Sequence, residues 1–229
     1  MRAIRTDAQA SRPAGGSLYF APCAARRPSG AIARFSKKGH AVTVSFVAVE
    51  SDQQLESLAD LAGEIWREYW PALIGKGQTE YMIEQFQSLP AMQKGIADQG
   101  YRYWFIADDE MDDRSDDGGS HAPWGPIVGY TGGYVEPETN RFFISKIYLL
   151  QSARGRGYCS KTIAFYEELC RHEGLSAMYL TVNKHNELGI RAYLGKGFET
   201  IDAVETDIGE GYVMDDFIMQ KEVTPAQQA

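Results

Sequence analysis

Hydrophobic and polar positions repeat with two different periods along the chain, and these periods predict its strands and helices. Residues 42–49 alternate and are rich in β-branched side chains, which predicts a first strand. Apolar residues then recur at helical spacing until Pro71, which predicts a first helix. A second helical region is expected over residues 79–99, where Pro90 should divide it.

The later part of the chain alternates short apolar strands with amphipathic helices. Strands are predicted at residues 101–108, 127–135, 144–150, 177–182, 199–204 and 214–222, and helices at residues 157–173 and 183–196. The resulting order, β-α-α-β-β-β-α-β-α-β-β, predicts one α/β domain with a mixed sheet. We place this domain at residues 41–224 and a short tail at residues 225–229.

Residues 1–40 lack any sustained periodicity. They are rich in Ala, Arg, Ser, Gly and Pro, and they carry eight basic residues and one acidic residue. This composition predicts a disordered leader. It is similar to an organellar transit peptide, and it lacks the continuous apolar segment of a secretory signal. The interpretation that we favour is a start codon assigned too far upstream, because random translated sequence has the same character.

The net charge of −8 conceals an asymmetry along the 229 residues. Residues 41–229 hold 15 basic and 30 acidic residues, a net charge of −15. A domain with this negative charge repels nucleic acid, whose binding requires a basic protein surface. It would attract a cationic small molecule or a basic peptide, although acidity that only maintains solubility explains the charge equally well.

Cysteine and histidine usage indicates the compartment and the absence of a metal centre. The three cysteines have neither metal-ligand spacing nor an even number, which favours a reducing cytoplasm over secretion. No two of the four histidines lie at ligand spacing, so no metal site is predicted. No apolar run approaches the ~20 residues needed to cross a membrane.

An acidic segment at residues 108–119 raises the question of calcium binding. Its carboxylates lack the alternating ligand spacing, the central glycine and the closing glutamate of a calcium-binding loop. A solvated acidic loop between two strands is the favoured interpretation.

Residues 144–160 contain the strongest candidate for ligand chemistry. The predicted strand is apolar on both faces, which is typical of a central strand. It leads into a turn with Gly155 and Gly157, which can adopt backbone angles that other residues reach only with strain. Because a helix follows at once, its unpaired amides and positive dipole end would face the turn. Arg154 and Arg156 add positive charge, so the segment is typical of a phosphate-binding element.

Three kinds of phosphate-binding turn could account for this segment. A P-loop requires a Gly-Lys-Ser/Thr ending, which is absent. A dinucleotide-binding turn requires a third glycine where Ser160 stands. The Arg/Gln-x-x-Gly-x-Gly/Ala turn that holds the pyrophosphate of coenzyme A fits at Arg154, Gly157 and Cys159, with cysteine in place of the last small residue. A basic helix start without any ligand remains the fourth alternative.

Three local patterns together resemble the general amine N-acetyltransferase superfamily, GNAT, of the small bacterial single-domain type. The first is the strand and turn just described, and the second is the run from Leu180 to Phe198. That run matches Asn-x-x-Ala-x-x-x-Tyr-x-x-x-Gly-Phe, with Gly189 where alanine is usual. The third is the ending Ile-Gly-Glu-Gly-Tyr-Val-Met-Asp-Asp-Phe-Ile-Met. The resemblance covers about residues 44–222 and implies a mostly antiparallel central sheet flanked by helices.

The resemblance implies a binding mode for acetyl-CoA as co-substrate. Two neighbouring strands, here residues 144–150 and 177–182, would separate and admit the pantetheine arm. Main-chain groups of Ile147 and Leu149 would pair with that arm, and the helix start would hold the pyrophosphate. The expected cofactor-binding residues are Ile147, Tyr148, Leu149, Arg154, Gly155, Arg156, Gly157, Tyr158, Cys159, Ser160, Asn186 and Tyr193.

The resemblance also implies catalytic roles. The Leu149 N–H would face the thioester oxygen as oxyanion donor, a contact worth about 2.7–4 kcal/mol elsewhere. Tyr193 matches the tyrosine that faces the leaving thiolate, and it would act mainly as hydrogen-bond donor. Asn186 would cap its helix and contact the cofactor. A role for Tyr193 as a core aromatic near Phe198 is the alternative.

No general base is evident from the sequence. Several family members carry one on the strand before the turn, where this chain has Phe143 and Ser145. The other candidates are Glu136 and Glu138 on the preceding loop, Glu64 or Glu68 on the first helix, or a chain of water molecules. We select Glu136.

The sequence therefore predicts an acetyl-CoA-dependent N-acetyltransferase that acts by direct transfer to a primary amine. The acceptor would be a small molecule or a peptide, cationic if the acidic body attracts it, and the protein would be a monomer or a homodimer. Transfer through an acetylated Cys159 is a weaker alternative, because the neighbouring pyrophosphate would oppose a thiolate. A non-catalytic coenzyme A-binding sensor or interaction domain is the rival from another functional class.

Overall fold

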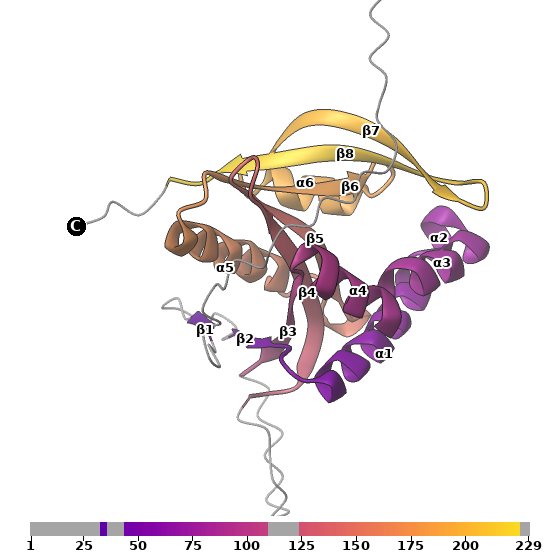
Figure 1. Cartoon of the computed structure of the whole chain (residues 1–229), viewed down its shortest axis with the longest axis horizontal. Helices are drawn as coiled ribbons and strands as arrows, with labels where there is room; N and C mark the ends of the chain where they lie inside the picture. The colour runs from indigo at the N-terminus through magenta and orange to yellow at the C-terminus, as the bar shows by residue number, and fades with distance from the viewer. Residues whose placement is uncertain (1–32, 36–43, 110–123, 225–229) are drawn as a thin grey trace, which may run out of the picture.

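One eight-stranded sheet organises the molecule (Figure 1). The computed structural model describes residues 33–35, 44–109 and 124–224. The strands are β1 (Ala33–Phe35), β2 (Val44–Ala48), β3 (Arg102–Asp108), β4 (Ile127–Glu136), β5 (Arg141–Leu149), β6 (Ala177–Asn183), β7 (Glu199–Gly209) and β8 (Tyr212–Glu222). Their order across the sheet is β1-β2-β3-β4-β5-β6-β8-β7. All neighbours are antiparallel except β5 and β6, so the predicted mixed, mostly antiparallel sheet is confirmed.

Helices cover both faces of this sheet. They are α1 (Asp52–Tyr69), α2 (Pro71–Ile74), α3 (Lys76–Met82), α4 (Leu89–Gln99), α5 (Tyr158–Glu173) and α6 (Glu187–Leu194), with a π-helical turn η1 (Ile83–Gln87) and a 3-10 turn η2 (Gln151–Ala153). Helix α5 packs on one face through Ile163, Phe165 and Tyr166. Helices α1 and α4 lie on the opposite face in Figure 1, where Leu58 and Met92 are fully buried. The two largest apolar cores among the described residues therefore lie on opposite faces of the sheet.

Local sequence explains where α1, α4 and α6 begin. Ser51 caps α1, because its side-chain hydroxyl oxygen accepts a hydrogen bond from the Gln54 N–H. The Gln54 side-chain oxygen accepts in turn from the Ser51 N–H, which completes a capping box. The break in the second helical region falls at Ser88, and Pro90 lies in the first turn of α4, where its missing N–H has no cost. The helix expected from residue 183 begins only at Glu187, because Asn186 is its N-cap.

Two segments depart from their predicted lengths. Strand β7 continues to Gly209 and strand β8 begins at Tyr212. The two strands therefore form a longer hairpin than the hydrophobic pattern predicted. Strand β5 begins at Arg141, three residues earlier than expected, because its first residues pair with both β4 and β6.

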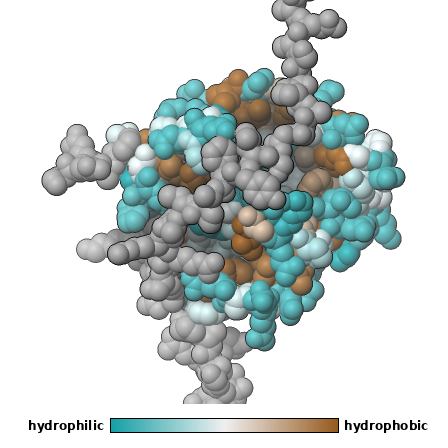
Figure 2. Space-filling model, in the orientation of Figure 1, coloured by the Kyte–Doolittle hydropathy of each residue, from teal (hydrophilic) through white to brown (hydrophobic). Residues whose placement is uncertain are grey.

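The predicted leader and the acidic segment lie largely outside the described residues. Within residues 1–40, the described positions 33–35 form β1, which pairs with β2. The acidic segment is described only as far as position 109. No helix among the described residues is both long and apolar enough to cross a membrane. On the face drawn in Figure 2, hydrophilic residues predominate and hydrophobic residues form separate patches.

A β-bulge in the pair β4–β5 lies in the middle of the sheet. Gly132 is opposite Lys146 and Gly133 is opposite Ile144, so Ser145 is an extra residue in β5. A Cβ atom on Gly133 would lie 2.0 Å from the Phe143 carbonyl oxygen. Glycine is therefore required for the close approach of the two backbones.

Gly133→Ala should destabilise the protein, because the added methyl group must displace backbone rather than a flexible side chain. We expect a loss of ~2 kcal/mol in the free energy of unfolding, measured by urea denaturation. The matched control is Gly63→Ala in α1, whose Cβ would meet only the end of the Arg67 side chain, at 3.0 Å. Alanine in a helix should there add ~0.5–1 kcal/mol. Equal stability of the two variants would show that the bulge does not require glycine.

Candidate functional site

Strands β5 and β6 separate along their length. Their parallel pairing covers only three positions, from Arg141 opposite Ala177 to Phe143 opposite Tyr179. Both strands continue beyond that point, to Leu149 and Asn183. The two strands predicted to separate therefore do so, and backbone groups along both inner edges lose their ladder partners.

A cavity of about 820 Å³ occupies this gap and extends over the α1–α4 face of the sheet. Its walls come from β3, β5, β6, β8, α1, α2, α3, η1, α4, α6, the turn before α5 and the first residues of α5. The volume is within the range of small-molecule and cofactor sites. Of the predicted site residues, those that line it are Ile147, Tyr148, Leu149, Arg154, Gly155, Gly157, Tyr158, Cys159, Asn186 and Tyr193. Arg156, Ser160 and Glu136 are not among the lining residues.

The Leu149 N–H faces the gap. The next amide, that of Leu150, donates to the Val128 carbonyl across the pair with β4, at 3.0 Å. Successive amides of a strand point to opposite edges, so the Leu149 N–H points away from β4 and toward β6. The Leu149 carbonyl on the same edge accepts from Arg154 Nε at 3.1 Å. The amide predicted as oxyanion donor thus lies on the open edge of β5.

The turn before α5 has the geometry of an anion site. Gly155 and Gly157 have φ angles of 77° and 90°, which favour glycine. Gly157 is the N-cap of the 16-residue helix α5 and provides no capping side chain. The first amides of α5 therefore have no side-chain cap, and the positive end of the helix dipole lies behind them.

The two arginines of the turn are held by carboxylates. Arg154 forms an ion pair with Glu68 of α1 at 3.2 Å, and its guanidinium lies 4.7 Å from the centre of the Tyr69 ring. Arg156 lies 3.5 Å from the fully buried carboxylate of Asp108, which also accepts the Tyr158 hydroxyl. These contacts fix the turn against α1 and β3. They also explain why Arg156 is absent from the cavity wall.

Tyr193 and Asn186 lie together on the α6 side of the cavity. The Asn186 Oδ1 atom accepts from the Gly189 N–H and from the Tyr69 hydroxyl, both at 3.0 Å. A Cβ atom on Gly189 would lie 2.8 Å from Asn186 Nδ2, which explains glycine where alanine is usual. Burial raises the pKa of Tyr193 above its ordinary value, so the phenol is protonated at neutral pH.

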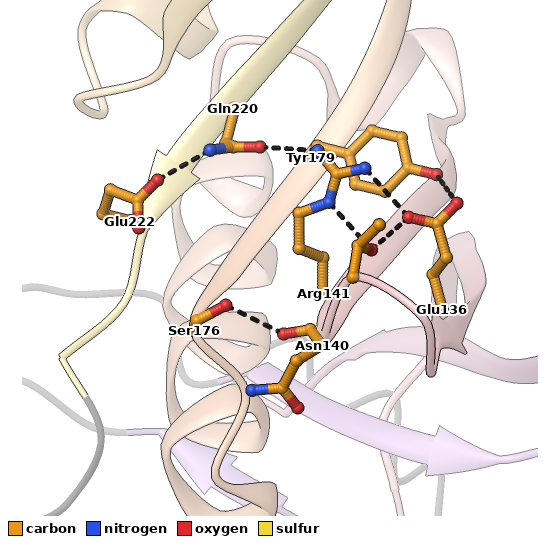
Figure 3. Close-up of polar contacts among 8 residues, drawn as sticks. Glu136, Asn140, Arg141, Ser176, Tyr179, Gln220 and Glu222 are labelled. Atoms are coloured by element: carbon orange, nitrogen blue, oxygen red, sulfur yellow. Dashed lines mark hydrogen bonds and ion pairs between the residues drawn. The ribbon is translucent and has the colours of Figure 1, made fainter.

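The arrangement does not favour Glu136 as general base. Its carboxylate accepts from Arg141 Nη2 at 2.9 Å, from the Tyr179 hydroxyl at 3.1 Å and from Thr139 (Figure 3). The Thr139 contact, followed by that of Arg141, lowers the Glu136 pKa. A carboxylate stabilised in this way is a weak proton acceptor. The alternatives Glu64, Glu68 and Glu138 do not line the cavity either.

Two ionisable side chains on the cavity wall were missed by the sequence reasoning. Asp216 of β8 is only 8% exposed, and burial, followed by the charge of Asp215, raises its pKa to about 6. Lys146 of β5 is 7% exposed, and burial lowers its pKa to about 8. Each interrupts an apolar strand, and that interruption was the signal available in the sequence.

Aromatic rings from the end of α1, from its C-cap Trp70 and from β5 line the same cavity as Asp216. Trp66 stacks on Trp70 at 5.1 Å and meets Tyr148 edge to face at 5.4 Å, measured between ring centres. Burial, followed by the charge of Asp216, raises the Tyr148 pKa, which places the carboxylate near that phenol. All four residues line the cavity. Among the described residues, no cluster of three or more His, Cys, Asp or Glu could hold a metal ion.

Comparisons with solved structures show the fold. The PaiA N-acetyltransferase of Thermoplasma acidophilum, in complex with coenzyme A, is 17% identical with a TM-score of 0.58, over 78% of this chain and 98% of that one. A GCN5-related N-acetyltransferase from Rhodopseudomonas palustris is 11% identical with a TM-score of 0.59, over 82% and 100%. Mutant forms of the spermidine/spermine N-acetyltransferase SpeG from Vibrio cholerae are 15% identical with a TM-score of 0.53, over 78% and 93%.

A comparison with curated protein sequences gave no match. The model of the acetyltransferase (GNAT) family matches residues 62–198, which is more than half of the chain. This range includes the C-terminal part of α1, the separated strands, the glycine turn and Tyr193. The chain therefore belongs to the acetyltransferase (GNAT) family and is an acyltransferase.

Proposed function

We propose that this protein transfers the acetyl group of acetyl-CoA directly to a primary amine in a ternary complex. The observation that carries the proposal is one continuous cavity that joins the open backbone edge of β5 to the uncapped start of α5. Coenzyme A carries both a chain of amides and a pyrophosphate, and the two parts of the cavity match these two chemistries. The coenzyme A complex of the PaiA enzyme with the same fold supports this assignment.

Backbone groups of β5 would hold the pantetheine arm. Ile147 and Leu149 present N–H and C=O groups to the gap, so an extended ligand can pair there as a strand would. The Leu149 N–H would donate to the thioester oxygen and stabilise the negative charge that develops on it. The first amides of α5, beginning at Tyr158, would bind the pyrophosphate.

Tyr193 would donate a hydrogen bond to the sulfur of the leaving group. A thiol has an ordinary pKa of about 8.5 and a tyrosine one of about 10. Burial raises the Tyr193 pKa further, so the phenol stays protonated while the thiolate forms. Its role is therefore stabilisation by hydrogen bonding, with complete proton transfer not required.

An acetylated Cys159 intermediate is disfavoured by the site. Burial raises the Cys159 pKa to about 11, and the opposing charge of Lys196 does not offset it. A thiol of this pKa is less than about 0.1% ionised at neutral pH. Direct attack by the amine needs no such intermediate.

The first test is whether the protein binds acetyl-CoA and turns it over. Binding should raise the melting temperature, because ligand at 100 times Kd adds about 2.7 kcal/mol. Thiol release should then occur with at least one member of a panel of polyamines, aminoglycosides, amino acids and peptides. The absence of any thermal shift at millimolar acetyl-CoA would refute the proposal. A shift without turnover would instead favour a coenzyme A-binding sensor.

Gly157→Val tests the anion site in the same assay. Gly157 and Gly174 lie at opposite ends of α5, have φ angles of 90° and 70°, and each has open space for a Cβ atom. Gly157→Val and Gly174→Val should therefore lose similar stability. Only Gly157→Val should lose the acetyl-CoA shift. Normal acetyl-CoA affinity in Gly157→Val would exclude this turn as the pyrophosphate site.

Tyr193→Phe should lower kcat by about 10- to 100-fold, the equivalent of one hydrogen bond to a charged group. The Kd for acetyl-CoA, measured by calorimetry, should change by less than about twofold. The control is Tyr179→Phe, which removes a hydroxyl that bonds Glu136 outside the cavity wall. Equal kcat values in Tyr193→Phe and wild type would remove Tyr193 from the mechanism.

Alkylation by iodoacetamide should report the buried state of Cys159. Because its pKa is raised to about 11, the rate should rise about tenfold per pH unit between pH 7 and pH 10 without a plateau. Peptide mapping separates Cys159 from Cys23 and Cys170. Incubation with acetyl-CoA alone should leave Cys159 unacetylated. A plateau below pH 9, or an acetylated Cys159 peptide, would revive the covalent route.

A further inference from the structure

Asp216 is a buried carboxylate without an ion-pair partner. Among the described residues, no lysine or arginine nitrogen lies within ion-pair distance of it. Lys184, the cation that acts on it, is paired with the adjacent Asp215. A hydrogen bond from Thr181 of β6 is its neutral polar contact. A buried charge with so little compensation is costly unless a ligand of opposite charge completes the site.

The surroundings of Asp216 suit a cation. It shares the cavity wall with Trp66, Trp70 and Tyr148, whose ring faces attract ammonium groups. Strand β8 places it opposite Asn183, on the separated part of β6. Asp216 and Leu149 thus line the same cavity, Asp216 from β8 and Leu149 from the open edge of β5.

Resting on the proposed acetyl transfer, we propose that Asp216 is the residue that binds the acceptor as a primary ammonium ion and accepts its proton. The ammonium gives one proton to the Asp216 carboxylate and becomes a neutral amine. The nitrogen lone pair forms the C–N bond with the acetyl carbon as the C–S bond breaks. The second nitrogen proton ends on the coenzyme A sulfur, through water or the Tyr193 hydroxyl, and Asp216 releases its proton to solvent.

The electrostatics of the site supports this role. With a pKa of about 6, Asp216 is ionised at pH 7 and yet more basic than an exposed carboxylate. The groups that face it are Asp215 of β8, which raises its pKa, Lys184 after β6, which lowers it, and the protonated phenol of Tyr148 on β5. The acceptor class that follows is a cationic primary amine.

Lys146 is the rival proton acceptor on the same wall. Its nitrogen lies 3.4 Å from Ser145 Oγ and 5.4 Å from the centre of the Tyr101 ring, with no carboxylate within ion-pair distance among the described residues. With a pKa of about 8 it is also partly neutral near pH 8. A cation there would repel an ammonium ion, which is why we assign the role to Asp216. The experiment must separate the two.

The test is the pH dependence of kcat/KM for the best acceptor of the panel, in wild type, Asp216→Asn, Asp215→Asn and Lys146→Met. In wild type kcat/KM should rise through the Asp216 pKa, near pH 6, and then level off. Asp216→Asn should lose this rise near pH 6, the acid limb of the profile. Its kcat/KM at pH 7 should also fall by about 10²- to 10³-fold. It must then use the free amine, so its kcat/KM should rise about tenfold per pH unit toward pH 10. Affinity for acetyl-CoA should stay within about twofold.

The matched control changes the neighbouring carboxylate. Asp215→Asn removes a negative charge and frees Lys184, so the acid limb should persist and move to lower pH. Lys146→Met should keep the limb. The proposal is overturned if Asp216→Asn stays within about threefold of wild type with its limb intact, or if only Lys146→Met abolishes the limb. Should Asp216→Asn fail to fold, a wild-type profile without an acid limb between pH 5 and pH 7 overturns it.

A binding measurement separates this proposal from the proposed function. If no acceptor is turned over, spermidine is titrated calorimetrically into protein saturated with coenzyme A. At pH 8 wild type should bind spermidine at least tenfold more tightly than Asp216→Asn, and acidification to pH 5 should weaken only wild type. Equal affinities overturn the role of Asp216. Failure of the proposed function is recognised independently, by the absence of an acetyl-CoA thermal shift or by a shift without turnover of any acceptor in the panel.

Discussion

The separation of β5 and β6 is the constraint on which the rest of the site depends. Backbone N–H and C=O groups require partners, and a sheet normally supplies them along the full length of each strand. Here the parallel pairing ends at Phe143 and Tyr179, while both strands continue. The facing edges of β5 and β6 are thus unpaired in the middle of the sheet. An extended ligand with amide groups can supply the missing backbone hydrogen bonds. The bulge at Gly132 and Gly133 lies at the same level of the sheet.

Helix α1 holds the open end of this gap in place. Glu68 accepts from the Gln151 N–H at 3.0 Å and pairs with Arg154, so it fixes the turn that leads to α5. The next residue, Tyr69, donates to Asn186 at the start of α6 on the other side. One turn of α1 therefore bridges the two structures that flank the cavity. Trp66 of the same helix and its C-cap Trp70 belong to the aromatic wall, so support and recognition come from one part of the chain.

Desolvation favours the uncharged form of each buried ionisable group of the site. It keeps Tyr193 and Cys159 protonated, and it brings the pKa values of Asp216 and Lys146 toward neutrality. Glu136 shows the opposite case, because it is more exposed and receives hydrogen bonds from Thr139, Arg141 and Tyr179 (Figure 3). On the cavity wall, the two groups whose pKa burial brings toward neutrality, Asp216 and Lys146, are therefore buried ones with few polar partners.

The sequence by itself determined the types and order of most elements, the glycine turn and the family, whereas β1 and α2 were not predicted. These follow from information that is local along the chain: hydrophobic period, helix caps such as Ser51 and Asn186, and glycines at positive φ. Boundaries were less well defined, because the length of β7 and β8 depends on pairing between them rather than on either pattern alone.

Only the tertiary structure decided which charged groups belong to the site. Asp215 and Asp216 are adjacent and chemically identical in the sequence, yet one pairs with Lys184 while the other is buried in the cavity wall. Glu136, by contrast, was selected from the sequence and lies outside that wall. The physical reason is that a pKa depends on desolvation and on neighbouring charges, and here β5, β6, β8 and α1 contribute these from distant parts of the chain.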